Sequence, residues 1–128
     1  MRYLHTMIRV GDLDRSIDFY ARVLGFAEVR RADYPDGKFT LAFLRAGGDA
    51  EGGPMLELTY NWGVEAYDLG NGYGHVAFRI ESMAEIADRL QAAGAQFSWG
   101  PGKTPDGKTT MAFIDDPDGY KIELLEYT

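Results

Sequence analysis

The stretch HTMIRV at residues 5–10 recurs in pattern as HVAFRI at residues 75–80. Each copy has a His, three further residues, an Arg and then a β-branched residue, and β-branched residues favour strands. A second copy 70 residues after the first (75 − 5 = 70) is the kind of self-similarity that internal duplication produces. The chain is therefore expected to contain two modules of similar structure, each opening with a strand.

A helical pattern follows each of these strands, over residues 12–25 and 82–94. Residues three and four apart share one helix face, so each segment presents an apolar stripe. Ser82 with Glu85 has the spacing of a capping box, and a glycine closes each segment. The stripe residues are Ile17, Tyr20 and Leu24 in the first helix and Met83, Ile86 and Leu90 in the second.

The later strands repeat as well, since LAFL at 41–44 resembles MAFI at 111–114, and MLEL at 55–58 resembles KIEL at 121–124. Turn signals rich in Gly, Pro and Asp separate these runs. We expect an α+β fold in which each module contains a strand, a helix and about three further strands. The whole chain, 1–128, is expected to form a single domain, with module 1 at about 1–62 and module 2 at about 74–128.

Composition limits the possible functions. The 128 residues are 45% hydrophobic and 26% charged, as in ordinary globular proteins, and the net charge is −7. An acidic chain gives a nucleic-acid-binding role no basic patch to rest on. The absence of cysteine excludes disulfides and thiolate chemistry. No signal peptide or membrane span is evident, so a cytoplasmic location is expected.

Side chains alternate between the two faces of a strand, and this parity separates polar from apolar residues. Leu4, Ile8 and Val10 share the face that a helix could cover, and Leu56 and Leu58 do the same further along. The opposite faces carry both histidines of the chain, two glutamates and other polar residues, namely His5, Arg9, Glu57, Thr59, Asn61, His75 and Glu123.

A carboxylate between two leucines, as Glu57 is, needs a compensating charge if it is buried. A divalent cation would supply that charge for both glutamates at once. Imidazole with carboxylate suits Zn, Ni, Co or Mn better than Ca. The sequence therefore predicts a metal site formed by His5, Glu57, His75 and Glu123. Arg9 shares a face with His5 and is a candidate binding residue, whereas Arg79 is interpreted as structural.

Four long motifs resemble the glyoxalase I (lactoylglutathione lyase) family of the vicinal oxygen chelate superfamily, in its short bacterial form. They are LHTMIRVGDLDRSIDFYARVLGF at 4–26, LELTYNWG at 56–63, YGHVAF at 73–78 and AFIDDPDGYKIELLE at 112–126. The resemblance covers nearly the whole chain. It implies two tandem βαβββ modules whose curled mixed sheets surround a metal cavity.

The resemblance assigns His5, Glu57, His75 and Glu123 as metal ligands, with Ni or Co as the expected ion and Zn possible. It implies a homodimer in which each site is shared between chains. Arg9 and Asn61 match residues that hold glutathione, as does Lys108, while Thr59 and Lys103 match less closely. The long eukaryotic pattern has an Arg where this chain has Asn71. A different carrier thiol, such as trypanothione, is therefore left open.

The implied reaction isomerises the hemithioacetal of methylglyoxal and glutathione to S-lactoylglutathione, which detoxifies methylglyoxal. Glu123 is the first choice for the base that moves a proton from C1 to C2, with Glu57 on the opposite side of the substrate. Two alternatives remain at this point. One is a metal-free ligand-binding module of the same fold, and the other is a superfamily enzyme that acts on a different thiol adduct.

Overall fold

The computed structural model describes residues 1–127. The chain divides into two compact units, unit 1 from Met1 to Asp68 and unit 2 from Leu69 onward. Both units have the order strand, helix, three strands, which confirms the predicted α+β fold of two βαβββ modules. The elements of unit 1 are β1 (His5–Arg9), α1 (Leu13–Leu24), β2 (Ala27–Tyr34), β3 (Phe39–Arg45) and β4 (Met55–Asn61).

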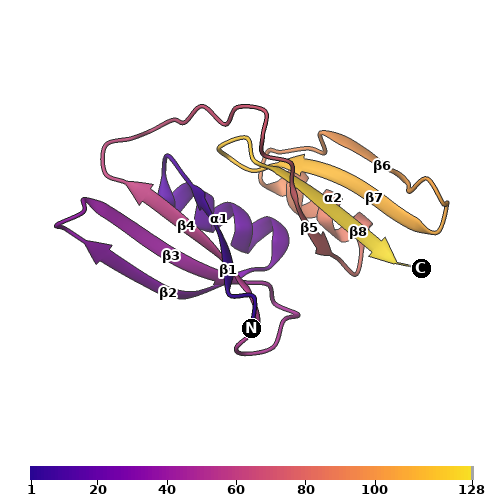
Figure 1. The fold of residues 1–128 in the computed structure, drawn as a ribbon. Helices are drawn as coiled ribbons and strands as arrows, with labels where there is room; N and C mark the ends of the chain where they lie inside the picture. The colour runs from indigo at the N-terminus through magenta and orange to yellow at the C-terminus, as the bar shows by residue number, and fades with distance from the viewer. Residues whose placement is uncertain (128) are drawn as a thin grey trace. The chain divides into compact units, whose positions relative to one another are not determined.

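The sheet of unit 1 has the strand order β1-β4-β3-β2, so its first and last strands are neighbours. β1 and β4 run parallel, and the other pairs are antiparallel. Helix α1 lies along one face of this sheet and leaves the other face open (Figure 1). The core between helix and sheet is formed by buried side chains, among them Val10, Tyr20, Val23, Ala42, Leu44 and Leu58.

Unit 2 repeats this arrangement with β5 (Val76–Arg79), α2 (Met83–Ala92), β6 (Trp99–Lys103), β7 (Thr109–Asp115) and β8 (Lys121–Tyr127). The strand order is β5-β8-β7-β6, and β5 and β8 are the parallel pair. Its buried side chains include Met83, Ile86, Leu90, Ala112, Ile114, Ile122 and Leu124. The three predicted stripe residues of α2 are thus all in the core.

The helix ends follow the signals in the sequence. The side chain of Asp12 accepts a hydrogen bond from the amide of Arg15 at the start of α1, and Gly25 ends the helix with φ 74°. The side chain of Ser82 caps α2 in the same way. One expectation for α1 was wrong in detail. Its buried face is Leu13, Ser16, Tyr20 and Val23, and Leu24 and Ile17 are only half-buried, because the sheet lies about one residue around the helix from the expected stripe.

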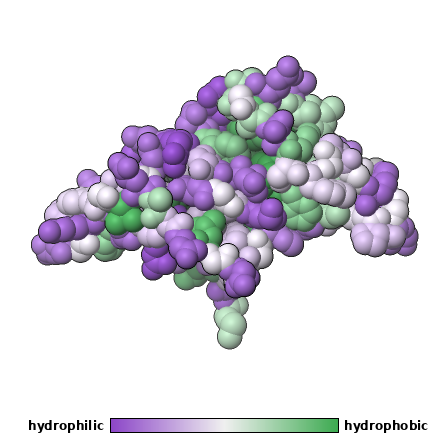
Figure 2. Space-filling view, turned by 90° about the horizontal axis from the view of Figure 1, so that it is seen from above, coloured by the Kyte–Doolittle hydropathy of each residue, from purple (hydrophilic) through white to green (hydrophobic). Residues whose placement is uncertain are grey.

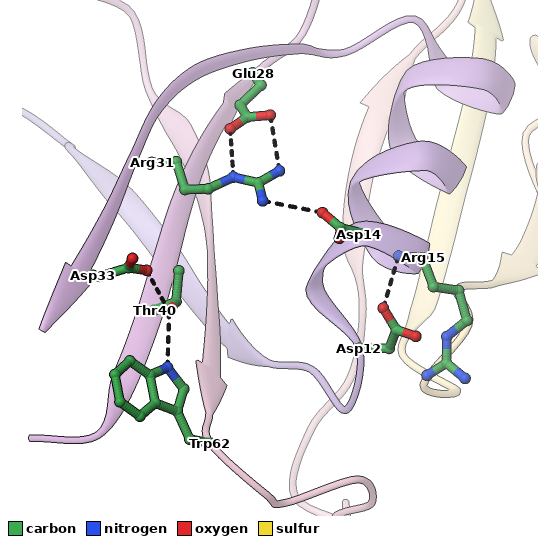
Figure 3. Close-up of polar contacts among 8 residues, drawn as sticks. All are labelled: Asp12, Asp14, Arg15, Glu28, Arg31, Asp33, Thr40 and Trp62. Atoms are coloured by element: carbon green, nitrogen blue, oxygen red, sulfur yellow. Dashed lines mark hydrogen bonds and ion pairs between the residues drawn. The ribbon is translucent and has the colours of Figure 1, made fainter. Parts of the chain in front are cut away.

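A second expectation was also wrong, since Leu4 precedes β1 and its side chain is exposed. A β-bulge in β2 changes its alternation between Glu28, which pairs with Leu44, and Arg30, which pairs with Phe43. The bulge brings Glu28 and Arg31 onto one face, where Arg31 donates to Glu28 and to Asp14 of α1 (Figure 3).

The surface seen in Figure 2 is largely hydrophilic, with hydrophobic residues interspersed. The exposed large hydrophobic side chains include Met7, Tyr34, Trp62 and Trp99. Along residues 1–127, no helix combines the length and the apolar character that crossing a membrane requires.

Candidate metal centre and substrate site

His5 and Glu57 meet on the open face of the sheet in unit 1. His5 begins β1, Glu57 lies in the middle of the adjacent parallel strand β4, and the register pairs Met7 with Glu57. The Nε2 atom of His5 lies 3.0 Å from Oε1 of Glu57, and the side chains are 35% and 12% exposed. An imidazole and a carboxylate are thus held together with their polar atoms still accessible.

Unit 2 contains the equivalent pair. Nε2 of His75 lies 3.6 Å from Oε1 of Glu123, with side-chain exposures of 42% and 18%. His75 directly precedes β5, and Glu123 lies on β8, opposite Ala77. The predicted equivalence of the two modules therefore extends to the local geometry of the two His–Glu pairs.

Each histidine also packs against a phenylalanine that the sequence reasoning did not single out. The ring of His5 contacts Phe43 edge-to-face at 5.4 Å between centroids, and His75 contacts Phe113 at 5.5 Å. Phe43 pairs with Glu57 across β3 and β4, as Phe113 does with Glu123 across β7 and β8. The signal was present, because both phenylalanines occupy the same position in the repeated LAFL and MAFI segments.

The predicted binding residues of unit 1 lie beside this pair. Thr59 is buried, and its hydroxyl donates to Oε2 of Glu57 at 3.1 Å. Asn61, at the end of β4, donates to the hydroxyl of Tyr67 at 2.9 Å. Arg9 is exposed at the end of β1 and pairs in register with Thr59. All three are on the open face with Glu57.

The two predicted lysines lie in unit 2, at the β6–β7 turn. Lys103 ends β6, and its amino group donates to the hydroxyl of Thr110 at 3.1 Å. Lys108 is exposed in the turn, where its backbone amide donates to Asp106. The hydrogen bond from Thr104 holds the pKa of the Asp106 carboxyl below its usual value. This turn is a defined local structure, and its role in binding stays a prediction.

The two His–Glu pairs fit a divalent cation by their chemistry. Imidazole nitrogen and carboxylate oxygen are ligands for borderline divalent metals, and each pair already has its donor atoms close together. Among residues 1–127, no three His, Cys, Asp or Glu side chains gather in one group. Each unit therefore supplies half of the predicted ligand set, and a four-ligand site stays a prediction.

Comparison with known proteins identifies the family. Residues 2–124 match the Glyoxalase/Bleomycin resistance protein/Dioxygenase superfamily. A lactoylglutathione lyase from Salmonella typhimurium is 50% identical over 126 residues, which are 98% of this chain and 93% of that protein.

Two solved structures are also similar. The trypanothione-dependent glyoxalase I of Leishmania major has a TM-score of 0.84 at 44% identity, with 98% of this chain and 86% of that chain covered. Glyoxalase I from Zea mays has a TM-score of 0.91 at 41% identity. This chain is covered to 99% there but spans just under half of the maize chain, 45%. The duplicated βαβββ fold, the paired His and Glu residues and these similarities lead to one conclusion: the chain belongs to the Glyoxalase/Bleomycin resistance protein/Dioxygenase superfamily and resembles its lactoylglutathione lyases.

Proposed function

We propose that this chain isomerises the hemithioacetal of methylglyoxal and glutathione to S-lactoylglutathione. The observation that carries the proposal is the His–Glu pair, which occurs at equivalent positions in both units. Identity of 50% to a lactoylglutathione lyase over nearly the whole chain supports the same reaction. Detoxification of methylglyoxal in the cytoplasm is the corresponding biological role.

The reaction needs a base that removes the proton from C1 of the hemithioacetal and an acid that returns a proton to C2. Glu123 is proposed as the base, and its environment supports this choice. It has a longer contact with its histidine than Glu57 has, 3.6 Å against 3.0 Å. Glu57 also accepts a hydrogen bond from the hydroxyl of Thr59, two residues further along the strand. The residue two positions after Glu123 is Leu125, whose side chain has no hydrogen-bond donor. Glu123 is therefore the less constrained carboxylate and the freer to move a proton.

His5, Glu57, His75 and Glu123 would hold a divalent cation, with Ni or Co proposed before Zn. When bound, the cation supplies Lewis-acid stabilisation for the negative charge that develops on the substrate oxygens, a contribution of several kcal/mol. Phe43 and Phe113 restrict the orientation of the two histidines through their edge-to-face ring contacts.

The thiol part of the substrate is proposed to bind along Arg9, Thr59 and Asn61, with Lys103 and Lys108 as further candidates. Arg9 and Asn61 lie beyond Glu57 in the direction of the β1 and β4 carboxyl ends. A guanidinium and an amide are suitable donors for the carboxylates of glutathione. We further propose a homodimer in which unit 1 of one chain and unit 2 of its partner share a site.

The testing experiment removes metal from the protein with a chelator and restores Ni, Co or Zn separately. Isomerisation of the glutathione hemithioacetal is then followed by the ultraviolet absorbance of the thioester product. Activity that disappears on chelation and returns with Ni or Co supports the proposal. A protein that binds metal tightly without turnover, with either glutathione or trypanothione as the thiol, contradicts it and favours a binding module.

A further inference from the structure

Two consecutive arginines on β2 point to opposite faces of the sheet. Arg31 pairs in register with the buried Ala42 and is held on the helix side by Glu28 and Asp14 (Figure 3). These hydrogen bonds, with Glu28 the largest cause, hold the pKa of Arg31 above its ordinary value. Arg30 pairs with Phe43 instead and lies on the open face. The bulge between Glu28 and Arg30 produces this placement, and bulges often re-aim side chains next to active sites.

Arg30 is close to the His5–Glu57 pair through one shared ring. Its guanidinium carbon lies 4.7 Å from the centroid of Phe43, and the same ring contacts His5. The register places Arg30, Phe43 and Glu57 in one row across β2, β3 and β4. Neighbouring strands are about 5 Å apart, so a guanidinium over Phe43 is about one strand spacing from the carboxylate strand.

Unit 2 shows that a phenylalanine at the position of Phe43 can pack on its histidine without a neighbouring cation. Trp99 occupies the equivalent position, since it pairs with Phe113, which pairs with Glu123. The Trp99 ring contacts Phe113 edge-to-face at 6.3 Å, and Phe113 still packs on His75. The two half-sites therefore share the His, Glu and Phe and differ in the outermost residue. The packing of Phe on His therefore does not require the positive charge that Arg30 brings to unit 1.

Arg30 approaches the pair from a different direction than the residues proposed to bind the thiol. Arg9 and Asn61 continue along β1 and β4, whereas Arg30 lies across the sheet on β2. A substrate whose thiol part follows β1 and β4 therefore presents another group to Arg30. In the hemithioacetal, that group is the part derived from the aldehyde.

We propose that Arg30 is a specificity-determining residue that binds a carboxylate at the far end of the aldehyde-derived group. The substrate class would then extend from methylglyoxal to 2-oxoaldehydes that end in a carboxylate. This inference rests on the proposed function. The isomerisation itself is unchanged, because the carboxylate takes no part in the proton transfer between C1 and C2.

The test compares two glutathione derivatives that differ in one group. S-Butylglutathione and S-carboxypropylglutathione have the same S-chain length, but the second ends in a carboxylate. Their binding to the metal-loaded protein is measured by titration calorimetry. Arg30→Gln is expected to weaken binding of the carboxypropyl derivative about tenfold, as for loss of a charge-assisted hydrogen bond, and of the butyl derivative less than about twofold.

Two matched variants complete the experiment. Arg30→Lys keeps the charge and should retain most of the affinity for the carboxylate. Arg22→Gln removes an exposed charge on α1 that pairs with Asp18, and it should change neither affinity. Turnover provides a second readout, in which Arg30→Gln should lower kcat/KM for the adduct of a carboxylated 2-oxoaldehyde, 4,5-dioxopentanoate, but not for that of methylglyoxal.

Equal losses for both glutathione derivatives would show that Arg30 contacts the thiol part, which overturns the inference. Unchanged affinity for both derivatives would also overturn it, because Arg30 would then contact neither ligand. Both results leave turnover of the methylglyoxal adduct in the unmodified chain intact. Absence of that turnover is the distinct result that overturns the proposed function, and this inference with it.

Discussion

The two glutamates of the candidate metal centre differ in how firmly they are held. One carboxylate oxygen of Glu57 faces His5 and the other accepts the hydroxyl of Thr59. Glu123 has the contact to His75, and its strand neighbour on the same face is Leu125. The duplicated modules thus carry the same acid in two settings, one fixed by two polar contacts and the other with more freedom.

This difference leads to a prediction for Glu123→Gln. The amide has the shape of the carboxylate but cannot take up the proton, and general bases contribute about 10²–10⁴-fold to rates. We expect kcat to fall by about that factor while bound metal, measured by atomic emission, is largely retained. Full turnover with full metal content would rule out Glu123 as the base. Glu57→Gln is the matched comparison and should lower metal content more than Glu123→Gln does.

Tyr73 is a polar residue that the candidate site does not use. Its ring packs edge-to-face on Tyr120 at 5.3 Å, and within residues 1–127 its hydroxyl oxygen is buried without a hydrogen-bond partner. Burial, with the charge of Asp116 as the next cause, raises the pKa of the Tyr73 phenol. The neutral phenol is therefore favoured in the folded protein.

A raised pKa has a defined sign in stability. The unfolded chain loses this proton at a lower pH, near 10, so the contribution of Tyr73 is complete below about pH 10 and is lost as the pH rises through the folded-state value. Tyr73→Phe should remove that alkaline component. At neutral pH it should leave stability unchanged or raise it by up to about 1 kcal/mol. Urea unfolding at neutral and alkaline pH measures both; a clear loss of stability at neutral pH would indicate a hydrogen bond to the hydroxyl.

Among the elements, the helices depend on short signals at their ends. Gly25 has φ 74° after α1, and its amide donates to the carbonyl of Ala21. Gly94 has φ 72° just beyond α2. These left-handed conformations close the helices so that the next strand can return to the sheet, and they disfavour any residue that has a Cβ.

Gly25→Ala is expected to lower the free energy of unfolding by about 1 kcal/mol, because alanine is strained at positive φ. Gly48→Ala is the control, since a Cβ there has open space and the backbone does not have the left-handed conformation. Its effect should be within about 0.5 kcal/mol. Urea denaturation compares the two, and equal effects would contradict the assignment of Gly25 to a helix cap.

Much of the fold could be predicted from the sequence because the two modules have similar sequence patterns. The repeated His–Arg strand, the glycine-terminated helices and the alternation around Glu57 and Glu123 predict the two modules. The same alternation predicts that the His and Glu residues share a face, and the observed His–Glu distances agree with that prediction.

What the sequence did not predict depends on pairing between distant strands. Alternation places Arg30 and Arg31 on opposite faces but cannot reveal the bulge, so it does not predict that Arg31 rather than Arg30 shares the helix side with Glu28. The contacts of Phe43 and Phe113 with the histidines require the register of β3 with β4 and of β7 with β8. Register is set by the packing of the whole sheet and is not visible in a single strand.

For the whole molecule, the open faces of the two units have the same strand arrangement but carry different side chains at equivalent positions. Unit 1 presents Arg9, Arg30 and Asn61, whereas unit 2 has Trp99 at the position equivalent to Arg30. Arg79, the counterpart of Arg9, lies with its guanidinium carbon 4.7 Å from the ring of Tyr127. This contact supports the interpretation of Arg79 as structural. The open face of unit 1, with Arg9 and Arg30, is therefore the more suitable face for a thiol compound that carries carboxylates.

Mixing two inactive chains tests whether sites are shared between partners. Glu57→Gln and Glu123→Gln chains each lack one carboxylate of the site. If unit 1 of one chain works with unit 2 of its partner, every mixed dimer contains one intact site, and random mixing restores about a quarter of the normal activity. If each site belongs to a single chain, no activity returns. Turnover measured after co-refolding, with each variant refolded alone as control, separates the two cases.

The parallel pairing of the first and last strands of each module gives the His–Glu pairs a role in chain entropy. His5 and Glu57 are 52 residues apart (57 − 5 = 52), and His75 and Glu123 are 48 apart (123 − 75 = 48). A ligand that binds both members of a pair would act as a reversible cross-link. Closing a loop of that size costs about 4 kcal/mol in the chain-entropy model, and a folded module, in which the two strands already pair, has met that cost before the ligand binds. Such a cross-link can form only after the last strand has found the first, so it would favour the completed module over every partly folded form.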